Sequence, residues 1–139
     1  GQPTDIAICA AAVSDWGVKS AASKKLKKPN DSNATMLLEL SQNPDILANL
    51  STSENRPKLV IGFAAETENL LENAQTKRRR KGCDWIIANQ VGDDDDPIFG
   101  STTNKALMIT ERNVETWPKM RKTELAEQLA DRIEAEFSE

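Results

Sequence analysis

The sequence predicts an α/β fold, a three-layer Rossmann-like sandwich in which helices cover both faces of a mostly parallel sheet that ends in a C-terminal β-hairpin. A continuous apolar run at residues 5–13 and two further predicted strands at residues 58–65 and 84–91 support this prediction. Runs of this kind are typical of strands buried on both faces of a parallel sheet. A helical pattern separates the second run from the third, and such alternation of strand and helix indicates an α/β architecture.

Between the first two runs, the sequence predicts a long polar loop at residues 16–33, a short strand at residues 36–40 and a helix that ends near Leu50. Asn43 is a favourable N-cap for that helix, and Pro44 suits its first position. The next helix is expected to start with Thr67 as its N-cap and to end at Gly82, a residue suited to the left-handed C′ position. Its apolar stripe is predicted to consist of Leu70, Leu71 and Ala74.

The last part of the chain is predicted to add a hairpin and a helix to the sheet. A polar loop at residues 92–103 contains four consecutive aspartates, and a strand at residues 105–110 is expected to pair with residues 113–117. Thr123 is the expected N-cap of the final helix. The predicted apolar stripe of this helix repeats every four residues and consists of Leu125, Leu129, Ile133 and Phe137.

The 139 residues are expected to form a single domain over residues 1–139. A doubly wound domain normally has a βα unit before a buried strand such as residues 5–13, so we expect the N-terminal, Gly-rich portion of the fold to be lacking. No apolar run approaches the roughly 20 residues of a membrane helix, and no secretory signal is evident. We therefore expect a cytoplasmic protein without membrane partners.

Charge and residue types exclude several function classes. A net charge of −4 and a pI near 5.0 argue against a general nucleic-acid binder. The chain has no histidine, and Cys9 and Cys83 form no CxxC pair, which argues against a zinc site and against histidine-assisted nucleophiles. Ten of the 18 basic residues nevertheless gather at residues 19–28 and 77–81, as in a site for a small, highly charged anion.

Four clusters are expected at the carboxyl ends of the strands, where doubly wound sheets bind ligands. Asp15 ends the first run, and its carboxylate could bind a ligand or simply cap a turn. Lys25, in the polar loop, could stabilise a phosphoryl transition state or lie in solvent. The helix start at residues 43–47 offers backbone N–H groups. Lys77 and Lys81 share one helix face. They could bind a triphosphate, or they could only stabilise the C-terminal end of the helix through its dipole.

Taken together, these segments resemble the phosphopantothenate–cysteine ligase family, in the same order and spacing from about Asp5 to Glu139. The resemblance is carried by Ala-Ala-Ala-Val-Ser-Asp-Trp at residues 10–16, Lys-Leu-Lys-Lys at 25–28, Asn-Pro-Asp-Ile at 43–46, Gly-Phe-Ala-Ala-Glu-Thr at 62–67, the basic residues 77–81 and Ala88-Asn89.

The resemblance implies a bacterial bifunctional protein whose other half is a decarboxylase that carries FMN. It implies CTP and Mg²⁺ as co-substrate and cofactor, and the substrates 4′-phosphopantothenate and L-cysteine, which are joined through an acyl-cytidylate in coenzyme A synthesis. It also implies a homodimer in the full-length enzyme. The family has a Gly-rich phosphate loop and an Asn-containing Ser-Ser-Gly stretch that are not in this sequence, so the full reaction is expected of the longer enzyme.

The resemblance also implies the roles of individual residues. Lys25 is expected to be the catalytic lysine, and no residue is assigned to the metal. The nucleotide site is expected to consist of Ala11, Ala12, Asp15, Lys25, Asn43, Pro44, Asp45, Ile46, Leu47, Phe63, Lys77 and Lys81.

Two other functions compete with the ligase. The chain could be a non-catalytic nucleotide-binding module or a fragment of such an enzyme. A Rossmann-type oxidoreductase is less favoured, because the sequence has no GxGxxG motif and no tyrosine or histidine to act as the acid.

Overall fold

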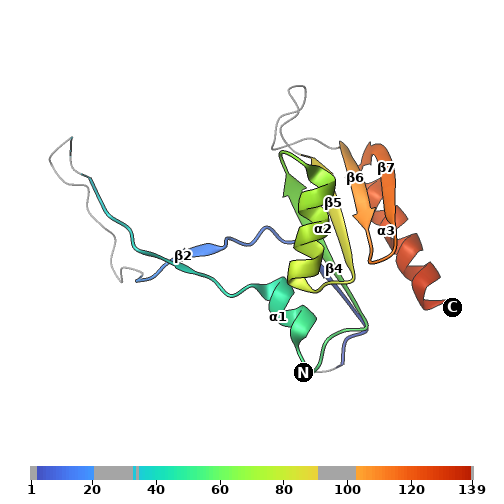
Figure 1. Ribbon diagram of the computed structural model, residues 1–139, viewed down its shortest axis with the longest axis horizontal. Helices are drawn as coiled ribbons and strands as arrows, with labels where there is room; N and C mark the ends of the chain where they lie inside the picture. Colours follow the sequence, from blue (N-terminus) through green and yellow to red (C-terminus); the bar gives the residue numbers. More distant parts are fainter. Residues whose placement is uncertain (1–2, 21–32, 34, 91–102, 139) are drawn as a thin grey trace. The chain divides into compact units, whose positions relative to one another are not determined.

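The computed structural model describes residues 3–20, 33, 35–90 and 103–138 (Figure 1). By its internal contacts, the chain divides into two compact units. One, which we call the inserted unit, is Ala11–Ile46. The other, the sheet unit, consists of Gly1–Ala10 together with Leu47–Glu139.

The sheet unit is built on five strands in the order β1-β4-β5-β6-β7. Strands β1 (Ile6–Cys9), β4 (Leu59–Glu66) and β5 (Trp85–Gln90) are parallel, with Ile8 opposite Ile61 and Phe63 opposite Ile87. Strands β6 (Thr103–Ile109) and β7 (Val114–Arg121) form an antiparallel hairpin, and β6 pairs antiparallel with β5. The parallel sheet with a C-terminal hairpin is therefore confirmed.

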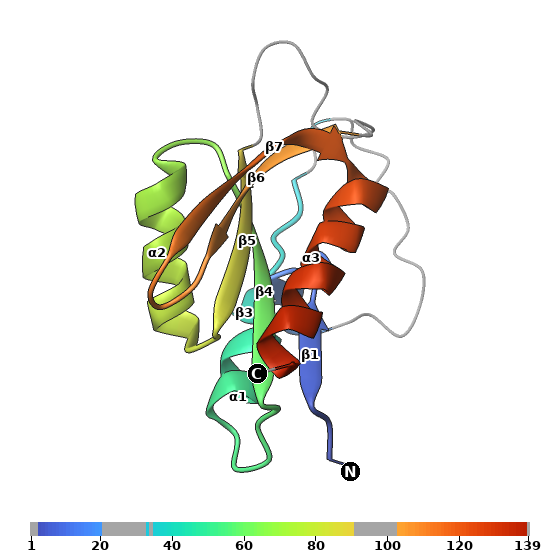
Figure 2. The ribbon, with the colours of Figure 1, turned by 90° about the vertical axis from the view of Figure 1, so that its right-hand side faces the viewer.

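Helices cover both faces of this sheet, as Figure 2 shows for α2 (Leu70–Lys81) and α3 (Lys122–Phe137). Because side chains alternate along a strand, β4 and β5 contribute to two separate cores. The core under α3 contains Leu59, Ile61, Trp85, Ile87, Ala106, Met108, Trp117, Leu125 and Leu129. The core under α2 contains Val60, Ala64, Ala74, Cys83, Ile86, Ala88 and Ile109. This is the predicted three-layer sandwich.

The ends of α2 agree only partly with the prediction. Gly82 ends the helix as expected, with φ 73° and its N–H donating to the Arg78 carbonyl at 2.9 Å. The start was expected at Thr67 but lies at Leu70, with Asn69 as N-cap at φ 46°. Asparagine tolerates this left-handed conformation, which threonine, being β-branched, does not. Leu71 is exposed and does not belong to the apolar stripe.

Helix α3 begins directly after β7, so the prediction of Thr123 as its N-cap is wrong. Arg121 is the N-cap, and the Glu124 carboxylate accepts hydrogen bonds from the Arg121 backbone N–H at 2.8 Å and from its guanidinium at 3.1 Å. Phe137, the last residue of the predicted stripe, is exposed. No helix in the described ranges is both long enough and apolar enough to span a bilayer.

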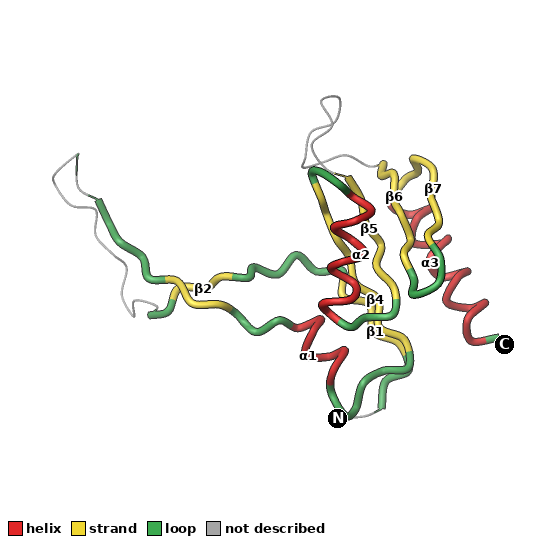
Figure 3. Tube along the Cα trace, in the orientation of Figure 1, coloured by secondary structure: helices red, strands yellow, loops and turns green. Residues whose placement is uncertain are grey.

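The inserted unit contains a two-stranded antiparallel ribbon of β2 (Trp16–Val18) and β3 (Leu40–Gln42), drawn in yellow in Figure 3. The strand predicted at residues 36–40 therefore begins only at Leu40. The first predicted strand ends at Cys9, four residues before Val13, and is not buried on both faces. Among the described strands it lies at the edge of the sheet, paired with β4, and 48% of Ile8 is exposed.

The hairpin and α3 are joined by a carboxylate that predicts a pH effect. Glu115 accepts hydrogen bonds from Trp117 Nε1 at 3.1 Å and from the Arg132 guanidinium. The Trp117 bond, and then the Arg132 bond, lower the pKa of Glu115 below its ordinary value near 4.5. Because the folded-state pKa is lowered, the stabilisation is present above pH 4.5 and is lost as the pH falls through the folded-state pKa.

We therefore expect Glu115→Gln to lower the free energy of unfolding by about 1 kcal/mol at pH 7 and by less at pH 3. Urea denaturation at the two pH values measures this difference. Glu111→Gln is the control, because Glu111 forms no ion pair with a described residue. An equal loss at both pH values would show that the charge of Glu115 is not what stabilises the hairpin.

Candidate functional site

Most of the predicted nucleotide residues lie in the inserted unit or at its end: Ala11, Ala12, Asp15, Asn43, Pro44, Asp45 and Ile46. Within this unit, the chain turns at Ser14, enters β2, and returns through β3 to Asn43. The Ser14 hydroxyl donates to the Trp16 carbonyl at 2.7 Å and accepts from the Trp16 N–H at 3.3 Å. Ala11, Ala12 and Asp15 are exposed.

Asn43 brings the two ends of the ribbon together. Its backbone N–H donates to the Asp15 carbonyl at 2.8 Å, and its side-chain Nδ2 donates to the Ser14 carbonyl at 2.9 Å. Helix α1 (Ile46–Thr52) starts three residues later, so Asn43 is not its N-cap and its N–H is not open to a ligand. The structure thus places Asp15 next to Asn43, as a shared site would require.

Gly17 was not among the predicted site residues, although it lies in this contact. A Cβ atom on Gly17 would come within 2.6 Å of Asn43 Oδ1. Glycine inside a short strand pattern often marks a close approach of another segment, and that signal was available in the sequence Trp-Gly-Val.

Leu47 and Phe63 contact opposite faces of the sheet. Leu47 packs against the core under α2, whereas Phe63 packs against the core under α3. A Cβ on Gly62 would lie 2.6 Å from Leu47 Cδ2 and 3.7 Å from Cys83 Sγ, so the glycine allows α1 to lie directly on β4. Within the sheet unit, these two predicted residues therefore pack on different sides of β4.

Lys77 and Lys81 lie on one face of α2, both half-buried and separated by about 6 Å along the helix axis. Their prediction as a group at the carboxyl edge of the sheet is wrong. Helix α2 runs back from the end of β4 to the start of β5, so Lys81 lies at the amino edge. Lys77 makes no hydrogen bond or ion pair with a described residue. The intervening Arg78 donates to the Cys83 carbonyl at 3.3 Å.

Two predicted features lie outside the described residues: Lys25 with its basic neighbours, and the acidic run at residues 93–96. Among the residues that the structure describes, no three metal-binding side chains gather in a group that could hold an ion. No protein ligand to a metal is therefore assigned.

Cys83 and Cys9 are both free; Cys83 is buried, whereas Cys9 is partly exposed. Burial raises the pKa of the Cys83 thiol above its ordinary value, and the Cys83 and Gly62 backbones and Arg78 offset this only in part. A buried thiol that resists ionisation is a poor nucleophile, so Cys83 acts as a small core residue.

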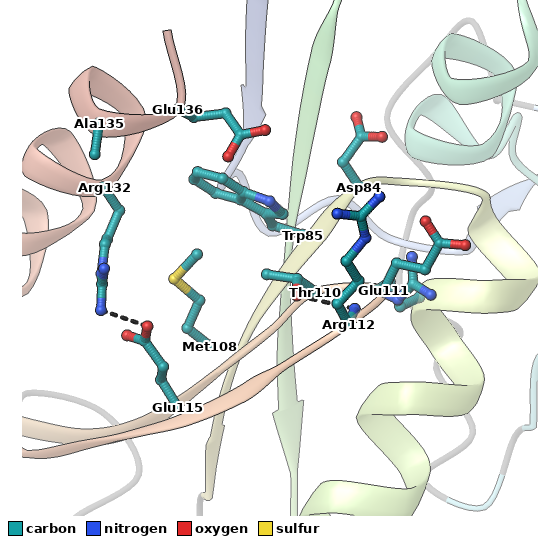
Figure 4. Close-up of a pocket in the computed structure, with 11 residues that line it drawn as sticks. Asp84, Trp85, Met108, Thr110, Glu111, Arg112, Glu115, Arg132, Ala135 and Glu136 are labelled. Atoms are coloured by element: carbon teal, nitrogen blue, oxygen red, sulfur yellow. Dashed lines mark hydrogen bonds and ion pairs between the residues drawn. The ribbon is translucent and has the colours of Figure 1, made fainter. Parts of the chain in front are cut away.

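A pocket of about 480 Å³ lies at the amino end of β5, between the β6–β7 turn and the last turns of α3 (Figure 4). Trp85 and Met108 form its apolar part, and the Glu115–Arg132 ion pair closes one side. None of the predicted nucleotide residues lines it. Its charged lining does not favour a triphosphate, because four carboxylates outnumber the three arginines and Arg132 is paired with Glu115.

Comparison with known proteins gives the family. Residues 2–137 match the model of the DNA/pantothenate metabolism flavoprotein C-terminal domain. The chain belongs to this family. The resemblance inferred from the motifs is thereby confirmed.

Relatives of this flavoprotein C-terminal domain include bifunctional coenzyme A biosynthesis proteins, named CoaBC. The Borreliella burgdorferi protein is 36% identical over 126 residues, which cover 90% of this chain and 30% of the relative. The Escherichia coli protein is 33% identical over 138 residues, which cover 99% of this chain and 34% of the relative. The chain thus spans about a third of the length of these relatives.

Solved structures of the family have the same fold. The crystal structure of the C-terminal domain of a CoaBC protein has a TM-score of 0.70 and 29% identity, and the match covers 96% of this chain and 55% of that one. A DNA/pantothenate metabolism flavoprotein from Streptococcus pneumoniae has a TM-score of 0.67 at 20% identity, which supports the fold alone.

Proposed function

We propose that this chain is the CTP-binding portion of a phosphopantothenate–cysteine ligase, which acts in the cytoplasm in coenzyme A synthesis. The observation that supports this most is the family match over residues 2–137, in relatives named for coenzyme A synthesis. The relatives are bifunctional, so FMN would belong to the decarboxylase half. The full-length enzyme is proposed to be a homodimer.

In the proposed reaction, a carboxylate oxygen of 4′-phosphopantothenate attacks the α-phosphorus of CTP, and pyrophosphate leaves. The amine of L-cysteine then attacks the acyl carbon of the acyl-cytidylate, CMP leaves, and the amine loses a proton. Phosphoryl transfer of this kind depends mainly on positioned positive charge. Mg²⁺ would enter with the CTP phosphates, as it does in many nucleotide enzymes, and no step is assigned to a protein-bound ion.

Each part of the predicted site has a place in this proposal. Lys77 and Lys81 would hold the phosphates, since these two half-buried lysines lie on one face of α2. The cytosine end would be read by the inserted unit and the start of α1. The residues proposed there are Ala11, Ala12, Asp15, Asn43, Pro44, Asp45, Ile46 and Leu47, with Phe63 lining the ribose and base pocket.

Nucleotide preference tests the proposed function. We expect CTP with Mg²⁺ to raise the melting temperature of the chain more than equal concentrations of ATP or GTP, because a ligand that binds only the folded state stabilises it by mass action. Differential scanning fluorimetry measures the three shifts. Equal shifts for all three nucleotides would contradict cytosine recognition, and CTP binding without turnover in the full-length protein would favour a non-catalytic binding module.

Lys25 is proposed as the catalytic lysine, which stabilises charge that develops on the α-phosphate. Such a residue matters more in the transition state than in the bound ground state. We expect Lys25→Gln in the full-length enzyme to slow acyl-cytidylate formation at least tenfold, roughly 1.4 kcal/mol, while CTP affinity changes much less. Single-turnover pyrophosphate release and CTP titration of the same variant measure both. Lost affinity with a normal rate at saturation would reduce Lys25 to a phosphate contact.

A further inference from the structure

Within the inserted unit, Asn43 joins two stretches of chain that are far apart in sequence. Both of its bonds, at 2.8 Å to the Asp15 carbonyl and at 2.9 Å to the Ser14 carbonyl, end on backbone oxygens. A backbone carbonyl fixes where the chain runs and leaves the side chain at that position uncommitted. Asn43 therefore sets the path of the Ser14–Asp15 segment against the segment that leads into Pro44.

Because Gly17 has no Cβ, the Asn43 side chain can lie closer to the backbone of β2 than it could beside any other residue. With a Cβ at position 17, an atom would lie 2.6 Å from Asn43 Oδ1 and 3.3 Å from Asn43 Cγ and Nδ2. Real Cβ contacts are essentially never that short, and the atom met is the end of the Asn43 side chain, so we expect the amide to shift and its bond to the Ser14 carbonyl to weaken. Asn43 and Gly17 thus form one unit, which we call the Asn43 clip.

The Asn43 clip holds the backbone of Asp15 but not its carboxylate. The Asp15 side chain is exposed and makes no hydrogen bond or ion pair with any residue in the described part of the chain. The neighbouring Ser14 hydroxyl is already engaged with the Trp16 backbone. The result is an acceptor group held by a fixed backbone and open on its outer side, as a preorganised ligand contact requires.

We propose that Asn43 is a positioning residue for nucleotide recognition: through the Asn43 clip it fixes Asp15 relative to Pro44 and Asp45, and does not itself contact the nucleotide. This inference rests on the proposed function, because it assigns Asp15 and the 44–45 segment to the cytosine end. It replaces a direct contact by Asn43 with an indirect role. It also gives Gly17 a part in recognition.

Two substitutions remove the side-chain bond of the Asn43 clip, to the Ser14 carbonyl, from opposite sides, whereas the backbone bond from position 43 to Asp15 remains in both. Asn43→Ala removes the amide, and Gly17→Ala displaces it while Asn43 is retained. For both variants we expect cytidine and CTP to bind more weakly by the same factor, about tenfold, because orientation of the base contact is lost and the phosphate contacts are not. Titration calorimetry gives the four affinities. The melting temperature of the unliganded protein should stay at the wild-type value.

Glu39→Ala is the matched control. It breaks the Lys19–Glu39 ion pair, which joins the same ribbon, without removing a basic residue or touching the Asn43 clip, so both affinities should remain unchanged. A double-mutant cycle then separates positioning from general support. In an Asp15→Ala background, Asn43→Ala should weaken cytidine little further, whereas with Lys77→Ala the losses of CTP affinity should add.

Three outcomes would overturn the positioning role: wild-type cytidine affinity in Asn43→Ala, loss of CTP affinity alone, or additive losses for Asn43 and Asp15. Each presupposes that the wild-type chain binds CTP. If the wild-type chain binds neither CTP nor cytidine, the proposed function fails, and the positioning role fails with it. If the wild-type chain binds both ligands and the variants bind them with wild-type affinity, only the positioning role is wrong.

Discussion

Replacing both Lys77 and Lys81 with alanine is expected to weaken CTP binding at least a hundredfold and to leave cytidine binding nearly unchanged. Cytidine has no phosphates, so it cannot lose contacts to the two ammonium groups. Each charged hydrogen bond contributes roughly 1.5–3 kcal/mol when it is partly shielded from water, so the pair accounts for about 3 kcal/mol or more. Both residues are half-buried on one face of α2, and this partial burial is the basis for the estimate.

The matched control removes the same charge from the same helix end. Arg79→Ala with Arg80→Ala takes away two exposed cations in the last turn of α2. If the effect of the lysines were only long-range attraction or support of the helix terminus, this control would weaken CTP just as much. We expect at most a small change, and titration calorimetry of both double variants with CTP and cytidine decides between the two explanations. An equal loss for cytidine in the lysine variant would mean that the lysines only stabilise the helix.

Trp117→Ala is expected to have the largest effect on stability, a loss of about 3–5 kcal/mol in the free energy of unfolding. Trp117 lies on β7, is 2% exposed, and belongs to the core under α3. Its removal leaves a cavity between the hairpin and α3, and Glu115 loses its Nε1 donor. A typical domain is stable by only about 5–15 kcal/mol, so this loss is a large part of the total.

Trp16→Ala is the control for the same residue type in the other unit. Trp16 is 58% exposed, and substitution of an exposed side chain usually changes stability by less than about 0.5 kcal/mol. Urea denaturation followed by far-UV circular dichroism measures both variants without depending on tryptophan emission. A Trp117→Ala protein within 1 kcal/mol of wild type, by the same measurement, would show that the core can collapse into the space.

Local signals in the sequence predicted the sheet unit well. Strands β4 and β5 and the end of α2 at Gly82 were predicted from residues close together in the sequence. The structure confirms all three predictions. The start of α2 was missed because Asn69 in a left-handed conformation is as good a start as Thr67, and only packing of the helix on the sheet selects one. The early end of β1 was missed because its run continues as exposed chain after Cys9.

The candidate site was harder to predict than the fold, for two different reasons. The edge at which Lys81 lies could have been deduced, because a helix between parallel strands must run back to the amino edge. The hydrogen bonds of Asn43 could not, since they join residues 29 and 28 positions apart, and nothing near Asn43 in the sequence indicates Ser14 or Asp15 as acceptors. Proposed roles that depend on Lys25 remain predictions, as this residue lies outside the described ranges.

The inserted unit leaves the sheet unit after β1 and returns before β4, two strands that are paired neighbours, with Cys9 opposite Gly62. The cost of closing such a loop grows only with the logarithm of its length, so doubling the insertion would cost the β1–β4 pairing about 0.6 kcal/mol. Evolution can therefore lengthen, shorten or recompose the inserted unit with little penalty to folding of the sheet. In the proposed site, recognition of the base can then change independently of the sheet unit, which carries Lys77 and Lys81.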